Sequence, residues 1–192
     1  MKKVIFGKRI ALIVFFCVVF LAFCSCGMNS EQYNVDGIEN FDKHVGHFEI
    51  NYQILPSEDF LEDYEYTNAD YHYRNDITSF FDIFGTQRSL ISVQYEKEEY
   101  KEAKSYCLQN MQLVDDFCLE HNGYTFLLNT QQLDMFPNWF NMVAYNDSLN
   151  CLVFMGFYGD YSTDDSQSVQ SNWSEFLEKH FSDIYDWSAD NG

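Results

Sequence analysis

The sequence predicts an α+β fold, a single domain built mainly of an antiparallel sheet with helices packed on one face. Three observations lead to this prediction. The 192 residues are 46% hydrophobic and 19% aromatic, enough for one core and too much for a disordered chain. Segments with the two-residue period of strands recur in the chain, and turn signals join them in pairs. Segments with the helical period precede and follow these pairs.

The first expected strand covers residues 46–56, where apolar and polar side chains alternate. A short amphipathic helix is expected over 77–84, because its apolar residues follow the helical period. Asp76 stands before it as a good N-cap, and Gly85 stands after it in the position that favours glycine. A second strand is expected over 90–95.

A longer helix is expected over 96–111, with Lys and Glu on its outer side. The apolar side of this helix consists of Tyr100, Ala103, Cys107, Leu108 and Met111. The last helix is expected to begin after Asn172, since Glu175 lies three residues later in a capping-box arrangement. The acidic, serine-rich stretch 159–171 before it is expected to be a loop.

Two antiparallel strand pairs are expected between these helices. Asn122-Gly123 interrupts the alternating segment 117–128 and suits a type I′ hairpin turn, because both residues tolerate positive φ. The second pair covers 138–146 and 151–158. The letters CLVFMGFY at 151–158 are apolar on both faces of a strand, which indicates a central strand.

The charge of the chain excludes one class of partner. Eleven Lys and Arg stand against 30 Asp and Glu, for a net charge of −19. Nucleic-acid affinity comes largely from basic side chains that displace counterions from phosphates. We therefore expect no nucleic-acid partner.

The N-terminus has the pattern of an export signal. Residues 1–9 carry four basic side chains and no acid, and an unbroken apolar run follows over 10–24. Fifteen apolar residues are short for a bilayer core of about 30 Å, which needs about 20 residues of helix. A signal peptide over 1–25 is therefore the prediction.

The signal ends in the letters LAFCSC at residues 21–26, which resemble the lipobox of bacterial lipoproteins. In that family the cysteine is joined to diacylglycerol, and the peptide bond before it is cut. Cys26 follows the small Ser25 and is the favoured lipid attachment site; the alternative, Cys24, follows the bulky Phe23. The resemblance implies a domain anchored by lipid to the outer face of the bacterial cell membrane.

The remaining chain divides into a flexible polar tether over 26–45 and one domain over 46–188. Loss of residues 1–25 removes four basic side chains and no acid, so 7 basic side chains remain against 30 acids, a net charge of −23. Such a domain repels anionic head groups, and cations are its natural counterparts.

Three cysteines lie in the body of the chain, at Cys107, Cys118 and Cys151. No pair has zinc-finger spacing, and the odd number permits at most one disulfide. Buried free thiols are the favoured interpretation over a bridge.

Motifs of catalysis are missing from the sequence: it contains no GxSxG, no GxxxxGK[ST] and no GxGxxG. Asp160, Asp164 and Asp165 are weak candidates for Ca²⁺, but their spacing is not that of an EF-hand, and a solvated acidic loop is favoured. No metal site and no cofactor is therefore predicted.

Four tyrosines lie in the acidic segment EDYEYTNADYHYRN: Tyr64, Tyr66, Tyr71 and Tyr73. Their rings suit either a recognition surface or the faces of a strand. The function favoured by these observations is a non-catalytic domain that binds a protein or peptide partner. The alternatives are a lipid-anchored wall or extracellular hydrolase and an immunity or sequestering protein for cationic peptides.

Overall fold

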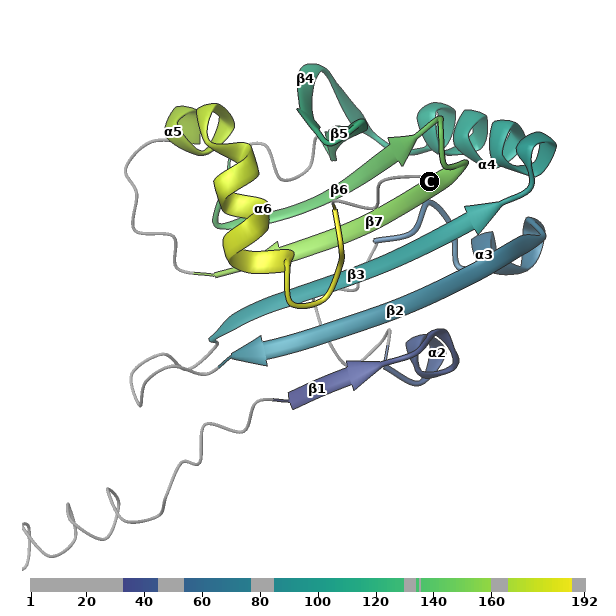
Figure 1. The fold of residues 1–192 in the computed structure, drawn as a ribbon, viewed down its shortest axis with the longest axis horizontal. Coiled ribbons are helices and arrows are strands. Elements are labelled where there is room, and N and C mark those ends of the chain that lie inside the picture. The colour runs from purple at the N-terminus through teal and green to yellow at the C-terminus, as the bar shows by residue number, and fades with distance from the viewer. Residues whose placement is uncertain are drawn as a thin grey trace, which may run out of the picture.

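The computed structural model describes residues 33–44, 54–76, 85–129, 134, 136–159 and 166–187. Within these residues one seven-stranded sheet runs in the order β1-β2-β3-β7-β6-β5-β4 (Figure 1). Every neighbouring pair is antiparallel. The predicted single-domain α+β fold with an antiparallel sheet is confirmed.

The elements have the following bounds. The strands are β1 (Tyr33–Asp36), β2 (Tyr66–Asp76), β3 (Thr86–Tyr95), β4 (Leu113–His121), β5 (Tyr124–Asn129), β6 (Trp139–Asn146) and β7 (Cys151–Tyr158). The helices are η1 (Ile38–Asn40), α2 (Phe41–His44), α3 (Phe60–Asp63), α4 (Lys97–Asn110), α5 (Ser166–Ser171) and α6 (Trp173–Phe181).

Helices pack on both faces of the sheet, so the prediction of helices on one face is wrong. Along β7, Val153 and Met155 point into one apolar cluster, and Leu152 and Phe154 point into the other. α5 and α6 contribute to the first cluster, whereas α3 and α4 contribute to the second. A central strand that is apolar on both sides requires cover on both sides, because its exposed side would otherwise leave large apolar area in water.

The face under α6, here called the α6 face, has an aromatic core. Phe140 of β6 stacks on Phe157 of β7 at 5.4 Å between ring centroids, and Trp173 stacks on Phe176 within α6 at 5.2 Å. Phe176 also meets Phe157 edge-on at 5.1 Å. Such pairs are worth about 0.5–1.5 kcal/mol each beyond the area that they bury. This cluster holds α6 against the sheet.

The opposite face, here called the α4 face, buries the predicted apolar side of α4. Tyr100, Ala103, Cys107 and Met111 are buried there, as expected. Leu108 is 43% exposed, so its assignment to the core is wrong. It directly follows Cys107, and one residue turns a helix by about 100°, which carries the side chain out of the contact.

Most predicted elements among the described residues are confirmed. The strand 90–95 is the second half of β3, the helix 96–111 is α4 with its caps, and β6 and β7 match the second strand pair. The hairpin of β4 and β5 turns at Asn122 (φ 46°) and Gly123 (φ 78°), both positive as a type I′ turn requires. The expected helix 77–84 and the expected strand 46–56, except its last residues, lie outside the described residues.

Two predicted segments without regular structure contain elements. β1, η1 and α2 lie within the predicted tether 26–45, and α5 occupies the end of the predicted loop 159–171. β1 has four residues, of which Val35 is buried while its neighbours Asn34 and Asp36 are exposed, so its alternation is too short to detect. The folded part therefore includes residues that precede 46.

β2 is a strand that the sequence analysis did not predict. The segment alternates Tyr71 and Tyr73, both fully buried, with polar residues on the opposite side. The inward-facing residues are tyrosines, which carry polar hydroxyls, and acids lie among them, so the sequence shows no clear alternation of apolar and polar residues.

Among the described residues, no helix combines the length and the apolar character needed to cross a membrane. The predicted signal peptide 1–25, which contains Cys24, and the favoured lipid attachment site Cys26 lie outside them.

Candidate functional site

On the α6 face, the sheet changes character between its two halves. In Figure 1, α6 crosses β6 and β7, and no described helix lies over β1 and β2 on that side. The register pairs His72 of β2 with Leu90 of β3, which belongs to the apolar cluster of this face. The side chains of β1 and β2 that define the polar half of this face are Asn34, Asp36, Asp70, His72, Arg74 and Asp76.

The polar half is organised around Asp36. Its Oδ1 lies 2.6 Å from Nδ1 of His72 and 2.7 Å from a guanidinium nitrogen of Arg74. The other ring nitrogen of His72, Nε2, lies 3.1 Å from Oδ2 of Asp70. The imidazole therefore lies between two carboxylates, and its contact with Asp36 joins β1 to β2.

The pKa of Asp36 reflects these contacts. Desolvation acts to raise it, but hydrogen bonds from His72 and Arg74, together with their charges, outweigh that effect and lower the pKa of the carboxyl. Asp36 is therefore a carboxylate throughout the physiological range. The two nitrogens of His72 face different carboxylates, so the arrangement does not converge on a single metal position.

Arg88 of β3 stands at the border between the halves. Its guanidinium lies 2.5 Å from Asp76 of β2 and 2.6 Å from Asp183 after α6, and it also donates to the carbonyl of His180. The arginine side chain is 8% exposed. This set binds the end of α6 to the sheet and is structural.

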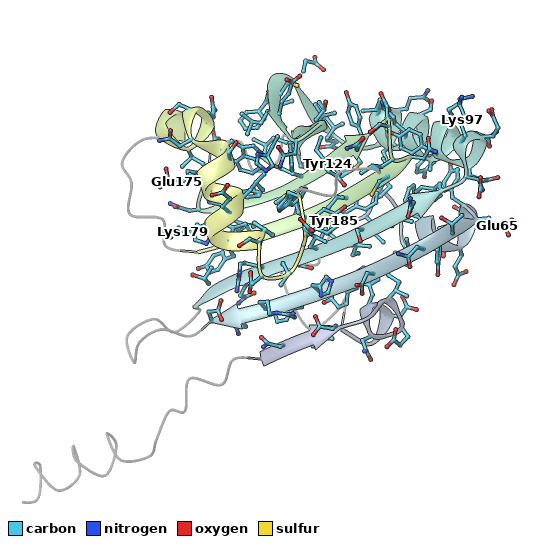
Figure 2. The ribbon with its side chains drawn as sticks, in the orientation of Figure 1. Glu65, Lys97, Tyr124, Glu175, Lys179 and Tyr185 are labelled. Atoms are coloured by element: carbon cyan, nitrogen blue, oxygen red, sulfur yellow. The ribbon has the colours of Figure 1, made fainter. Side chains whose placement is uncertain are left out.

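A second polar surface lies at α3, here called the acidic end. Five exposed carboxylates occur within eight residues: Glu58, Asp59, Glu62, Asp63 and Glu65. None of them forms an ion pair within the described part of the chain. In Figure 2, Glu65 points outward beside α3, at the end of the molecule where β2 begins.

Tyrosine rings accompany these acids. Tyr64 is half-buried, and its ring lies 5.2 Å from that of Phe60 and 5.8 Å from that of Tyr106 on α4. Burial raises the pKa of Tyr64, and the charges of Asp63 and Glu102 contribute, so carboxylates of α3 and α4 both lie near this ring. The acidic end therefore combines negative charge with amphipathic rings.

The four tyrosines singled out in the sequence divide between core and surface. Tyr71 and Tyr73 fill the α4 face, whereas Tyr64 is half-buried and Tyr66 is 38% exposed. Position within β2 explains the division, because 71 and 73 share the covered face while 64 and 66 lie at or before the start of the strand. A recognition role remains available only to Tyr64 and Tyr66.

A serine–histidine pair occurs near the β4–β5 turn. Nδ1 of His121 lies 2.9 Å from Oγ of Ser174 on α6, and the amide nitrogen of Asn122 lies 3.1 Å from Nε2. No carboxylate of the described residues forms an ion pair with this imidazole, and Ser174 is exposed. The pair therefore lacks the acid that orients the histidine of a serine–histidine–acid triad.

The body cysteines are free thiols, as favoured from the sequence. Cys107 and Cys151 are buried as expected, whereas Cys118 is exposed, so the prediction of burial is wrong for that thiol. Desolvation raises the pKa of Cys107 to about 12 and also raises that of Cys151, which lies 3.8 Å from the hydroxyl of Tyr185. Neither buried thiol has the lowered pKa of a nucleophilic cysteine. Figure 2 shows Tyr185 beside Tyr124, whose hydroxyl lies 2.8 Å away.

No group of three or more His, Cys, Asp or Glu side chains within the described ranges is arranged to hold a metal ion. The calcium candidates Asp160, Asp164 and Asp165 lie outside those ranges. The polar half and the acidic end were not found from the sequence. The polar half depends on the pairing between β1 and β2, which the sequence does not show. Of the acidic end, the sequence shows only the run of acids around α3 as a charge pattern.

Comparison with protein-family models, with curated proteins and with solved structures gives no match for this chain. Its function is therefore argued from its own residues.

Proposed function

We propose that the chain is a surface lipoprotein whose domain binds a protein or peptide partner with a cationic contact surface, without catalysis. The single observation that carries the choice of partner is the acidic end, where five carboxylates without ion pairs surround half-buried and exposed tyrosines. Tyrosine rings bury large area at little cost in conformational entropy, and the acids select partners of opposite charge.

The distribution of basic side chains supports this choice. Arg74, Arg88, Lys101 and Lys104 each lie within 2.7 Å of a carboxylate elsewhere in the molecule. Lys104 also lies 3.6 Å from the centre of the Tyr145 ring. These cations are committed to contacts within the domain, so the charge at α3 is left for a partner or for counterions from the solvent.

The anchor is the second part of the proposal. An acidic domain is repelled by anionic head groups, so attachment requires lipid rather than a basic patch. A lipid on Cys26 supplies it, and Cys24 is the alternative position.

Metabolic labelling with a fatty-acid probe tests the anchor in a bacterial host. We expect Cys26→Ala to abolish labelling of the full chain and Cys24→Ala to leave it intact. Loss of label with Cys24→Ala alone moves the site to that residue. Labelling that neither variant affects contradicts the lipoprotein assignment.

Binding of a fluorescent nona-arginine peptide to the full chain in non-ionic detergent tests the acidic end. The triple variant Glu62→Gln, Asp63→Asn, Glu65→Gln is compared with a control of equal charge change, Glu120→Gln, Glu175→Gln, Glu178→Gln, whose residues are exposed elsewhere. We expect the first triple to weaken binding about tenfold or more at low salt and the second to weaken it about two- to threefold through net charge alone.

Equal weakening by the two triples contradicts a localised site, because only the net charge then matters. Binding that does not respond to salt contradicts recognition through charge. A further variant, Tyr66→Ala, separates the contribution of the exposed ring from that of the carboxylates.

A further inference from the structure

β1 is attached to the sheet by few groups. It is an edge strand of four residues that pairs only with β2, over His72–Asn75. Val35 is the buried apolar residue among the side chains of β1 that the structure describes. Charged contacts on the polar half therefore carry an unusually large share of the attachment.

Two side chains of β2 hold Asp36, and they differ in how they respond to pH. Arg74 approaches Asp36 at 2.7 Å and also donates to the carbonyl oxygens of Val35 and Tyr73. A guanidinium stays charged at every pH that a folded protein experiences. His72 approaches the same carboxylate oxygen at 2.6 Å, and imidazole changes charge between about pH 5 and pH 8 in ordinary surroundings.

The imidazole of His72 lies between two carboxylates. Nδ1 is 2.6 Å from Oδ1 of Asp36 and Nε2 is 3.1 Å from Oδ2 of Asp70. An ionised carboxylate only accepts hydrogen bonds, so each ring nitrogen attracts its carboxylate only while it carries a proton. A neutral ring directs a lone pair at one of the two carboxylates, and that contact becomes repulsive.

We propose that His72 is a proton-dependent clasp: its imidazolium fastens the edge strand β1 to β2 through Asp36, and loss of the proton loosens β1.

The charged groups around His72 come from each element beside it. On η1, Glu39 is exposed near the end of β1, and on β3 Arg88 is already paired with Asp76 and Asp183. The groups on β1 and β2 are Asp36, Asp70 and Arg74. Two carboxylates in direct contact and one arginine shared with Asp36 therefore face the imidazole of His72.

The direction of the pH dependence follows from the two partners. The pKa of Asp36 is lowered despite partial desolvation, because His72 and Arg74 donate to it, so its contribution is present above that pKa and lost in strong acid. The contribution of His72 is present while the ring is protonated and is lost as rising pH removes the proton. The clasp is therefore closed at mildly acidic pH and weakened at alkaline pH.

Opening of the clasp has two structural consequences. It uncovers the hydrogen-bonding edge of β2 over His72–Asn75, and a free strand edge is a template for another strand. It also adds four residues to the segment before the domain, at most about 14 Å at about 3.5 Å per extended residue. The clasp depends only on contacts within the domain, so its failure leaves the proposed anchor and partner unaffected.

Hydrogen–deuterium exchange of the peptide covering β1, measured on the full chain in non-ionic detergent, tests the clasp. Wild type and His72→Gln are compared at the same pH, so that the intrinsic exchange rate cancels. We expect β1 to exchange about two- to fivefold more slowly in the wild type at about pH 5.5, the range for a partly exposed ion pair, and equally in both at about pH 8.5.

Three further variants keep the result interpretable. Arg74→Gln removes a contact that does not titrate, so its effect on β1 exchange should be the same at both pH values. His121→Gln removes a histidine of the distant strand β4 and should leave β1 unchanged. Asp36→Asn, on the exposed edge strand, should cost more protection at about pH 5.5 than at about pH 8.5. A wild-type to His72→Gln ratio that is the same at both pH values overturns the proposal, as does an equally pH-dependent effect of Arg74→Gln.

Discussion

Two histidines over the same face of the sheet have opposite surroundings. His180 of α6 lies over the apolar half, with its ring 4.7 Å from that of Phe176 and 5.0 Å from that of Phe157. Burial, followed by the charges of Lys179 and Arg88, lowers the pKa of His180 to about 4. His72 lies on the polar half between two carboxylates. The covering helix α6 therefore surrounds His180 with aromatic rings, whereas carboxylates flank His72 on the half that no described helix covers.

The border between the halves lies within single strands. β3 contributes Leu90 to the apolar cluster, and two residues earlier on the same face it contributes Arg88, which is nearly buried and whose two terminal nitrogens are paired with Asp76 and Asp183. A buried guanidinium is tolerated only when it is paired in this way. Arg88 thus joins the end of α6 to the polar half.

Removal of α6, the helix that covers the apolar half, is expected to have the largest effect on stability. Deletion of residues from Asn172 onward removes six buried apolar side chains: Trp173, Phe176, Leu177, Phe181, Ile184 and Trp187. Each is worth about 1.5–3 kcal/mol when buried, against a total stability of about 5–15 kcal/mol. We expect the truncated chain to show no cooperative thermal transition by circular dichroism.

The matched deletion on the polar half is removal of residues 1–36, which takes away β1 and one buried apolar residue of the described part, Val35. This variant should still unfold cooperatively, with stability reduced by about 1–3 kcal/mol. A cooperative transition in the chain that ends at Ser171 would show that α6 is an appendage and that the two halves do not differ in stability.

Substitution of Arg88, at the border between the two halves, is expected to have an intermediate effect on stability. Arg88→Gln leaves Asp76 without its cation and removes the donor to the carbonyl of His180, while Asp183 is 52% exposed and readily solvated. We expect a loss of about 1–3 kcal/mol in the free energy of unfolding, measured with urea. Lys101→Gln on α4 is the control, because its pair with Glu98 is exposed, and it should change stability by less than about 0.5 kcal/mol. Equal effects would mean that Arg88 does not join the halves.

The apolar elements on both faces of the sheet were predictable from the sequence, and the polar half was not. α4, α6 and the strands β3 and β5–β7 have long apolar periods that arise from burial of one or both sides, so their local pattern reports their environment. Asn172 stands at the N-cap of α6 as predicted but makes no side-chain capping bond. In the polar half, Asp36, Asp70 and His72 become neighbours only through the pairing of β1 with β2, across 36 positions between Asp36 and His72.

The smallest expected effect is a difference in pH response between the halves. His180 has a folded-state pKa near 4, below the ordinary value of 6.5, so the unfolded chain binds its proton first as the pH falls. Above about pH 6.5 His180 is neutral in both the folded and the unfolded chain, so it does not change the free energy of unfolding. This free energy falls progressively between about pH 6.5 and pH 4. The ring is partly exposed, so solvent screening reduces the loss, and we expect about 1–2 kcal/mol at pH 4.

His180→Leu should remove this loss, so that the stability difference between variant and wild type, measured with urea, shifts in favour of the variant as the pH falls. His72→Gln should shift in the opposite direction over the same range, because the wild type gains its clasp as His72 takes up a proton. A stability difference between His180→Leu and wild type that is constant from pH 7 to pH 4 would show that the cover of α6 does not hold His180 neutral.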